Sequence, residues 1–432
     1  MFMLKVMQVK LPNRVTILFL VIALFKSGTG MAQTPDAAYL SGCAYLKKGN
    51  LPQALEKFSV AISRNNADER LFICRGQVSM GLKDYENAIR DFNEANEILP
   101  GVSDIWLARA YSLAGDQARA LSFLKSHLSS GFRLPEDSIK KDPAFDRIQN
   151  SQGWYSLWEQ EWYNDEEKTS SDVAYDVRKG FQDKAMSQLD AEIGRSPSGA
   201  GLFMLRGEVN YTAGNYALAI ADYSTAIDLY KNKERGVIPL EGLKSGKAEV
   251  SGGGPFALRG QAYLKAGRFK DAISDYNRVL KDNPAFFPAY LNRAEAYAGL
   301  KSYDVSIRDV QTYLQYFEND LQAVFQCGEY YFLTEDYINA LKYFNRNLKE
   351  DPVNSKYFKA RGKAYLKAGT YRYAISDLSM SLDLNPDDSE TWMYIGLAKS
   401  LSGDRENGCS DLEKARQLGN TEVLKYIIEN CQ

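Results

Sequence analysis

One feature constrains the fold of this chain more than any other: a unit of 34 residues recurs without a gap over residues 253–418. Its clearest mark is a small residue at one place in five successive units: Gly260, Ala294, Gly328, Gly362 and Gly396. Three places later, four of the units carry a tyrosine: Tyr263, Tyr297, Tyr331 and Tyr365. Twelve places after the first mark comes a second small residue: Ala272, Ser306, Ala340, Ala374 and Gly408. A fixed period of this length is typical of proteins built from stacked repeats.

Each unit carries two amphipathic segments of about a dozen residues at helical period, joined by a short turn. Residues 358–366 and 371–382 are one such pair. The small residues are expected where two helices approach closely, because a bulky side chain there would force the backbones apart. Aromatic residues such as Tyr276 and Phe344 are expected to fill the space between neighbouring pairs. Prolines in the same phase end the second helix of a unit: Pro284, Pro352 and Pro386.

This pattern resembles the tetratricopeptide repeat (TPR). The same marks return earlier in the chain, at Gly42 and Phe58 and again at Gly76 and Phe92, while a third unit near Ala108 is degenerate. The resemblance implies an all-α fold, a TPR-type α-solenoid of antiparallel helix pairs. It also implies a concave groove, lined by the first helix of each pair, in which extended peptides lie. We expect two arrays of repeats with short helical caps.

The predicted domain boundaries follow the points where the period starts, fails and resumes. They are a signal peptide (1–32), an N-terminal TPR array (33–130), a helical cap and linker (131–171), a C-terminal TPR array (172–418) with a Gly-rich insert (231–254), and a C-terminal capping helix (419–432). Within the cap, Pro135 and Pro143 each open a short helix, with Asp142 as N-cap of the second. The cap is expected to cover the exposed apolar face of the last repeat. The polar, acidic residues 164–171 are the predicted linker.

The first residues have the features of an export signal. Lys5, Lys10 and Arg14 precede an apolar run over residues 15–25, and small residues stand at Gly30 and Ala32. The run is too short to cross a bilayer, which needs about 20 residues. We therefore predict an exported protein of the periplasm or cell envelope, with no stable membrane insertion after signal cleavage. The Ala-Gln pair at this cleavage site, Ala32-Gln33, is similar to that of many exported proteins of Bacteroidota.

The charge of the mature chain bears on its partners. Removing residues 1–32 removes four basic residues and no acidic one, which takes the formal net charge from −2 to −6. A mildly acidic chain argues against a nucleic-acid partner, because phosphate neutralisation needs a basic surface. The predicted partner is a protein or an extended peptide.

The most informative surface feature is a stripe of lysines in one predicted helix, at Lys356, Lys359, Lys363 and Lys367. Steps of 3, 4 and 4 residues align their ammonium groups along one face. The TPR resemblance turns this face toward the groove. In one interpretation, Lys363 pairs with Glu329 on the neighbouring helix and the stripe is solvated. In the other, the lysines receive a carboxylate from an acidic segment of the partner. The candidate partner-binding residues are Lys356, Lys359, Lys363, Lys367, Glu329, Glu295 and Phe332.

Two of the five cysteines belong to a segment that closes the chain. Residues 408–431 resemble the closing segment of exported Bacteroidota TPR proteins, in which a glycine, here Gly419, breaks the chain and the final helix folds back. Counted from that turn at 1.5 Å per residue, Cys409 and Cys431 lie roughly 14 Å and 18 Å along their helices and can meet. In an oxidising compartment this pair is a disulfide candidate.

No pattern of catalytic or cofactor-binding residues is recognisable in the sequence. The chain has a single histidine, His127, which rules out a histidine-rich metal site and argues against histidine-based catalysis. We therefore predict no cofactor, no metal and no enzymatic activity. The predicted function is a non-catalytic, protein- or peptide-binding scaffold of the bacterial cell envelope. The alternative is an enzyme or carbohydrate-handling factor with a site in the 231–254 insert or the 131–163 tail.

Overall fold

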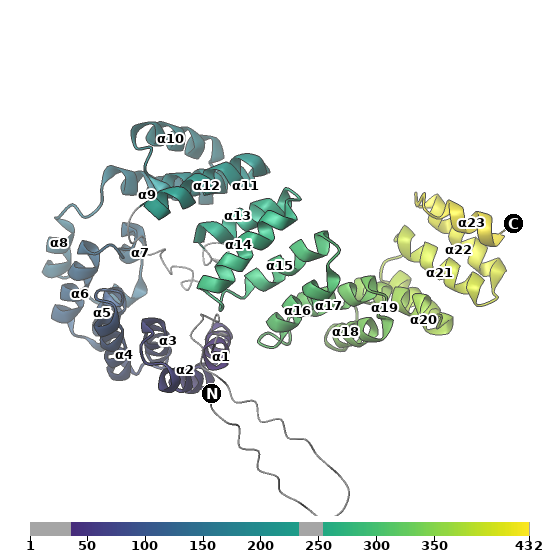
Figure 1. The fold of residues 1–432 in the computed structure, drawn as a ribbon, viewed down its shortest axis with the longest axis horizontal. Coiled ribbons are helices and arrows are strands. Elements are labelled where there is room, and N and C mark those ends of the chain that lie inside the picture. Colours follow the sequence, from purple (N-terminus) through teal and green to yellow (C-terminus); the bar gives the residue numbers. More distant parts are fainter. Residues whose placement is uncertain (1–35, 233–253, 432) are drawn as a thin grey trace, which may run out of the picture. The chain divides into compact units, whose positions relative to one another are not determined.

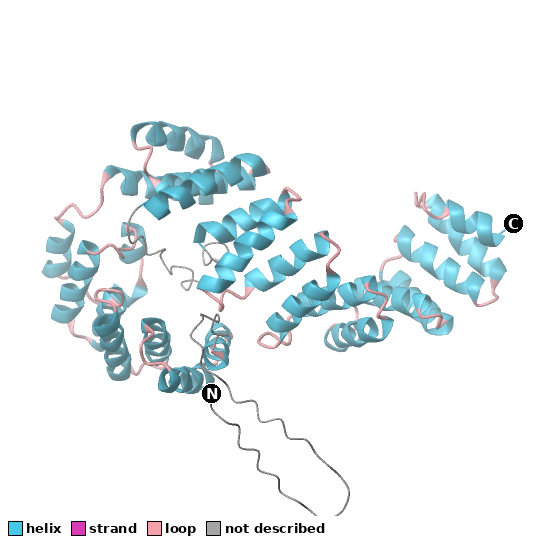
Figure 2. Ribbon diagram, in the orientation of Figure 1, coloured by secondary structure: helices cyan, strands magenta, loops and turns pink. Residues whose placement is uncertain are grey.

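The computed structural model describes residues 36–232 and 254–431, and every regular element in these two ranges is a helix (Figures 1 and 2). Each helix packs against the next along the chain through most of this length. The predicted all-α solenoid of helix pairs is therefore confirmed. The predicted signal peptide and nearly all of the Gly-rich insert lie outside the described residues.

Six helices form the first three pairs. They are α1 (Ala37–Lys47), α2 (Leu51–Arg64), α3 (Glu69–Gly81), α4 (Tyr85–Ile98), α5 (Asp104–Ala114) and α6 (Gln117–Ser129). Short polar residues set their starts: the side chain of Asp36 accepts a hydrogen bond from the amide of Ala38, and that of Asp84 accepts one from the amide of Asn87. These caps satisfy amides that have no partner inside the helix.

The 131–163 tail forms α7 (Glu136–Lys140), the 3-10 helix η1 (Pro143–Phe145) and α8 (Gln152–Trp158). As expected, Asp142 caps η1 by accepting a hydrogen bond from the amide of Ala144. Phe145 and Trp154 are buried in one core cluster with Leu107 of α5 and Leu124 of α6. The tail thus covers the apolar face of the third pair, and its large apolar side chains are used for packing.

Residues 165–171, for which the sequence indicated a linker, instead begin the helix α9 (Asp165–Lys179). Asn164 and Glu167 form a reciprocal capping box, in which each side chain binds the backbone amide of the other residue. Acidic residues are favoured in a first helical turn because the helix N-terminus carries a partial positive charge. The acidic composition was therefore a helix-start signal. An ion pair of 2.8 Å between Arg133 and Glu167 joins α9 to the start of the 131–163 tail.

The remaining helices continue the series to the C-terminus. They are α10 (Gln182–Arg195), α11 (Ala200–Thr212), α12 (Tyr216–Asn232), α13 (Gly254–Lys265), α14 (Phe269–Asp282), α15 (Pro288–Gly299), α16 (Tyr303–Leu314), α17 (Leu321–Leu333), α18 (Tyr337–Glu350), α19 (Ser355–Lys367), α20 (Tyr371–Leu384), α21 (Ser389–Leu401), α22 (Arg405–Gln417) and α23 (Leu424–Cys431).

The small residue of each unit lies where its two helices touch. A Cβ atom added to Gly328 would lie 2.7 Å from a ring atom of Phe344, and one on Gly260 would lie 3.0 Å from the ring of Tyr276. The predicted close approach is therefore confirmed. The expected place of the aromatic residues needs a correction: each ring packs against the glycine of its own helix pair, 16 residues earlier, and not only between neighbouring pairs.

A set of ion pairs that the sequence analysis missed repeats with the same phase. An arginine just before the small residue binds an aspartate 16 residues later: Arg75–Asp91, Arg206–Asp222, Arg259–Asp275, Arg293–Asp309 and Arg361–Asp377. Most of these arginines also reach the preceding helix pair, as when Arg293 donates to Asn277 at 2.7 Å. Each such guanidinium therefore fixes the two helices of its pair and ties that pair to the one before.

At the end of the described residues, Ile427 of α23 and Val423, just before this helix, pack in one cluster with Leu412 of α22 and Met393 of α21. A disulfide joins Cys409 of α22 to Cys431 of α23, the pair that the closing segment had suggested. Within the described ranges, no helix combines the length and apolar character that crossing a membrane requires.

Candidate functional site

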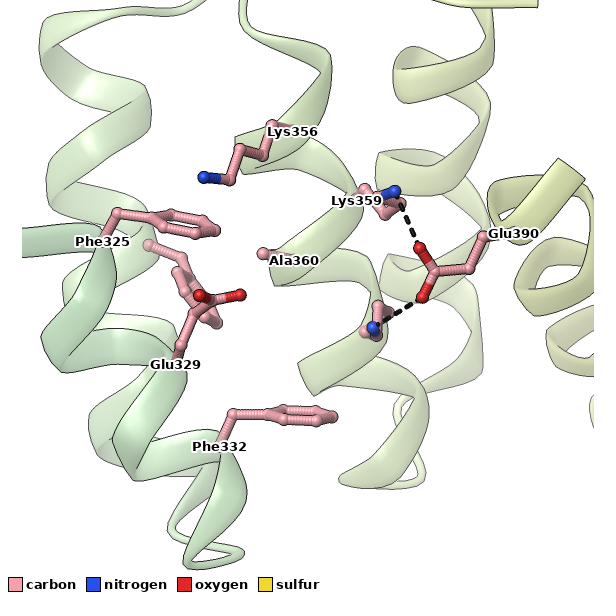
Figure 3. A pocket seen from close by; sticks show the side chains of 9 residues that line it. Phe325, Glu329, Phe332, Lys356, Lys359, Ala360 and Glu390 are labelled. Carbon is pink, nitrogen blue, oxygen red and sulfur yellow. Dashed lines mark hydrogen bonds and ion pairs between the residues drawn. The ribbon is translucent and has the colours of Figure 1, made fainter. Parts of the chain in front are cut away.

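The candidate site is a cavity of about 290 Å³ formed by α17, α18, α19 and α21 (Figure 3). Its lining residues are Phe325, Glu329, Phe332, Phe344, Lys356, Lys359, Ala360, Lys363 and Glu390. Five of the seven residues predicted from the lysine stripe and the repeat phase lie on this cavity, and they come from two successive first helices. The structure therefore brings the basic stripe of α19 together with the aromatic residues of α17.

Three phenylalanines form the apolar wall of the cavity. Phe325 and Phe344 are each 1% exposed, and their ring centroids lie 5.6 Å apart. Phe332, about two turns of α17 nearer its C-terminus than Phe325, is half-buried beside Tyr337. On the facing helix, Ala360 has only a methyl group, which leaves the space open. A cavity with these walls can accept an apolar side chain.

Lys356 lies at one end of the cavity with its ammonium group 4.0 Å from the centroid of the Phe325 ring. The residue is exposed, and among the described residues its ammonium group makes no ion pair. The ring face attracts the cation without neutralising it. Lys356 thus presents a positive charge beside an apolar wall.

Lys359 and Lys363 are engaged by acidic residues of α21. The two oxygens of Glu390 lie 2.8 Å from the Lys359 ammonium and 3.0 Å from that of Lys363, and Asp388 lies 2.9 Å from Lys359 (Figure 3). Partial burial lowers the pKa of both lysines, but it is outweighed for Lys359 by Glu390 and Asp388 and for Lys363 by Tyr394 and Glu390, so the pKa of each is raised. We expected Lys363 to pair with Glu329 of α17, whereas its observed carboxylate partner is Glu390 of α21.

Glu329 projects into the cavity from α17, opposite the lysines of α19 (Figure 3). Burial raises the pKa of its carboxyl group above the ordinary value, and the nearby charges of Lys356 and Lys363 only partly oppose this. The cavity therefore holds charges of both signs around an apolar centre.

Two predicted residues lie outside the cavity, and four of its lining residues were not predicted as site residues: Phe325, Phe344, Ala360 and Glu390. Glu295 is exposed on α15, and Lys367 is exposed in the last turn of α19. Glu390 was not singled out, although it stands 34 residues after Lys356 and so holds the equivalent place in the next unit. Carrying the repeat phase one unit further would have placed it on the same face.

Comparison with known proteins identifies the class of protein that this fold defines. A family model described as tetratricopeptide repeat matches residues 176–234 and 258–320. This match identifies tetratricopeptide repeats in those residues, and the observed helix pairs continue the same architecture on either side of them. Proteins of this family are generally scaffolds for protein interactions.

The individual relatives are distant and match only part of the chain. DnaJ homolog subfamily C member 3 of Gallus gallus is 27% identical over 160 residues, which cover 37% of this chain and 28% of that protein. Hsp70-Hsp90 organizing protein 2 of Arabidopsis thaliana is 26% identical over 98 residues, covering 23% of this chain and 17% of that protein. The chain thus spans less than a third of the length of these relatives.

Among solved structures, a TPR protein of Parabacteroides merdae aligns with a TM-score of 0.44 at 20% identity, covering 61% of this chain and 97% of that one. The C-terminal part of a TPR repeat-containing protein of Cytophaga hutchinsonii aligns with a TM-score of 0.47 at 14% identity, covering 59% of this chain and 98% of that one.

Proposed function

We propose that this chain is a non-catalytic scaffold of the bacterial cell envelope, and that it binds an extended protein segment across α17, α19 and α21. The observation that carries the proposal is the cavity, where aromatic walls and the exposed ammonium group of Lys356 lie side by side. Buried aromatic pockets beside charged groups are where interfaces concentrate their binding energy. Export and residence in the envelope rest on residues 1–32, the predicted signal peptide.

The lining favours a partner segment of defined chemistry. An apolar side chain fits against Phe325 and Phe332, and removing it from water supplies most of the binding free energy. A carboxylate next to that side chain in the partner would meet Lys356. The partner is therefore an extended segment in which an apolar residue neighbours an acidic one.

Site-specific photo-crosslinking in the native host tests this proposal. A photoreactive amino acid replaces Phe332 in the cavity, and in a matched protein it replaces Ile338, which is 83% exposed on α18 and does not line the cavity. We expect position 332 to capture defined segments of envelope proteins that mass spectrometry identifies as carrying an apolar residue beside an acidic one. Position 338 should not capture these segments.

Charge variants then test whether the captured segment uses the lysine. Lys356→Glu should abolish capture at position 332. Lys367→Glu makes the same charge change on the same helix outside the cavity and should leave capture intact. The proposal is wrong if both positions capture the same proteins, or if the two lysine variants behave alike.

A further inference from the structure

The carboxylate of Glu390 lies between two lysines at the edge of the candidate cavity. Both of its oxygens are used, one by Lys359 at 2.8 Å and the other by Lys363 at 3.0 Å, and these lysines stand one turn apart on α19. Figure 3 shows the carboxylate reaching from α21 toward α19 at the edge of the cavity. Charge-assisted hydrogen bonds from two ammonium groups to the two oxygens of one carboxylate fix the position of that carboxylate.

The start of α21 does not need Glu390 as its cap, because Asp388 already accepts hydrogen bonds from the amides of Glu390 and Thr391. The side chain of Glu390 is still 41% exposed, and those of its two lysine partners are 24% exposed. Ion pairs with this much solvent access exchange partners readily, since their net strength is small.

We propose that Glu390 is a built-in competitor. Its carboxylate binds Lys359 and Lys363 until a carboxylate of the bound segment displaces it. This inference rests on the proposed function, because it assigns a role to one residue of the same cavity. Lys359 keeps Asp388 as an acidic partner during the exchange, whereas Lys363 exchanges its one carboxylate partner among the described residues and keeps the ring of Tyr394, 4.7 Å away.

The exchange makes the site selective. Replacing one carboxylate by another on the same lysines changes the binding free energy very little, so an acidic segment alone does not displace Glu390. A segment that also places an apolar side chain against Phe325 and Phe332 gains free energy from burial, which drives the exchange. Lys356, which has no acidic partner among the described residues, gives the incoming segment its first contact. The site therefore requires both features in one partner.

Removing the competitor tests this inference with synthetic probes. The probes are fluorescein-labelled peptides with amidated C-termini and Gly-Ser flanks around one of three cores: Glu-Phe-Glu, Gln-Phe-Gln or Glu-Ala-Glu. Fluorescence anisotropy measures their affinity for the mature protein, for Glu390→Gln and for Glu422→Gln. The last variant makes the same charge change at an exposed position outside the cavity.

We expect Glu390→Gln to bind the Glu-Phe-Glu peptide about 10-fold more tightly than the unmodified protein does, the equivalent of two exposed ion pairs. The Gln-Phe-Gln peptide should show no such gain, and Glu422→Gln should behave as the unmodified protein. The Glu-Ala-Glu peptide should bind only the Glu390→Gln variant. Glu390→Asp, which keeps the charge on a shorter side chain, should give an intermediate gain. Circular dichroism confirms that each variant keeps its helices.

The outcomes separate the inference from the proposed function. If Glu-Phe-Glu binds Glu390→Gln and the unmodified protein equally well, and Lys356→Glu weakens both, the groove binds peptide but Glu390 does not compete. If Gln-Phe-Gln gains as much as Glu-Phe-Glu, carboxylate exchange is wrong. If the Glu-Phe-Glu peptide binds neither protein, the inference and the peptide chemistry of the proposed function both fail.

Discussion

The guanidinium of Arg361 donates two hydrogen bonds to the carboxylate of Asp377, at 2.6 and 2.8 Å, from the first helix of one pair to the second. A third bond, at 2.7 Å, reaches Asn345 of the preceding pair. The pair adjoins the candidate cavity in sequence, because Arg361 lies between Ala360 and Lys363. The contact that joins successive repeats therefore also fixes the helix that carries the lysine stripe.

Breaking this contact should destabilise the repeats. Arg361→Met leaves the carboxylate of Asp377, which is 6% exposed, without its cation. We expect the free energy of unfolding to fall by about 3 kcal/mol, measured by urea denaturation. Arg372→Met, the same change at an exposed position on α20, should cost less than about 0.5 kcal/mol. Equal losses in the two variants would show that the ion pair does not hold the repeats together.

Truncating the ring that packs on Gly328 should have a similar cost. Phe344 is 1% exposed, so Phe344→Ala removes buried contacts and opens a larger cavity beside Phe325. We expect a loss of about 3–5 kcal/mol in thermal or urea unfolding. Ile338→Ala on the same helix, where the side chain is 83% exposed, should change stability by less than about 0.5 kcal/mol. A small loss for Phe344→Ala would contradict the packing role given to this ring.

The repeat phase made the fold and much of the cavity predictable from the sequence. A glycine or alanine every 34 residues indicates a helix crossing, and the residue that follows it is placed toward the groove. That rule placed Glu329 and Lys363 on facing helices, and both line the cavity. The period works as a predictor because each repeat contacts mainly its neighbours, so local spacing fixes the packing.

The ion-pair partners could not be predicted in the same way. A lysine side chain has four carbons between backbone and charge, so Lys363 can reach an acidic residue on either α17 or α21. The sequence offered Glu329, and the structure selects Glu390.

The unit that contains Cys327 departs from the arginine–aspartate pattern. Cys327 stands where the arginine is expected and Tyr343 where the aspartate is expected, and the side-chain amide of Gln311 lies 3.4 Å from the Tyr343 hydroxyl. A motif search for arginine and aspartate alone would miss this neutral substitute.

The disulfide of the closing segment gives a direct chemical prediction. Mature protein purified after export, denatured without reduction, should show three free thiols, and five after reduction. The three are Cys43, Cys74 and Cys327. Reduction should destabilise the C-terminal cap by about 3 kcal/mol, the chain-entropy value for cysteines 22 residues apart. A Cys409→Ser, Cys431→Ser double variant should match the reduced protein, and five thiols before reduction would contradict the bridge.

The single histidine predicts how the stability of the N-terminal array depends on pH. His127 is 2% exposed, and its Nε2 accepts a hydrogen bond of 2.9 Å from the amide of Leu134. Protonation would remove that acceptor and place a charge in the core. Burial, helped by the nearby charge of Arg109, lowers the pKa of His127 to about 4 from its ordinary value of 6.5.

Because the folded-state pKa is the lower of the two, the unfolded chain binds more protons between pH 6.5 and about 4. The stabilising contribution of neutral His127 is therefore complete above pH 6.5 and is lost as the pH falls toward 4. The loss amounts to about 1.4 kcal/mol per pH unit, or about 3 kcal/mol in total. Urea denaturation at pH 7.5, 5.5 and 4.5 measures it. His127→Gln offers an acceptor that does not titrate, so the variant should lose less stability than the unmodified protein over this range. Parallel pH profiles for the two proteins would contradict this assignment.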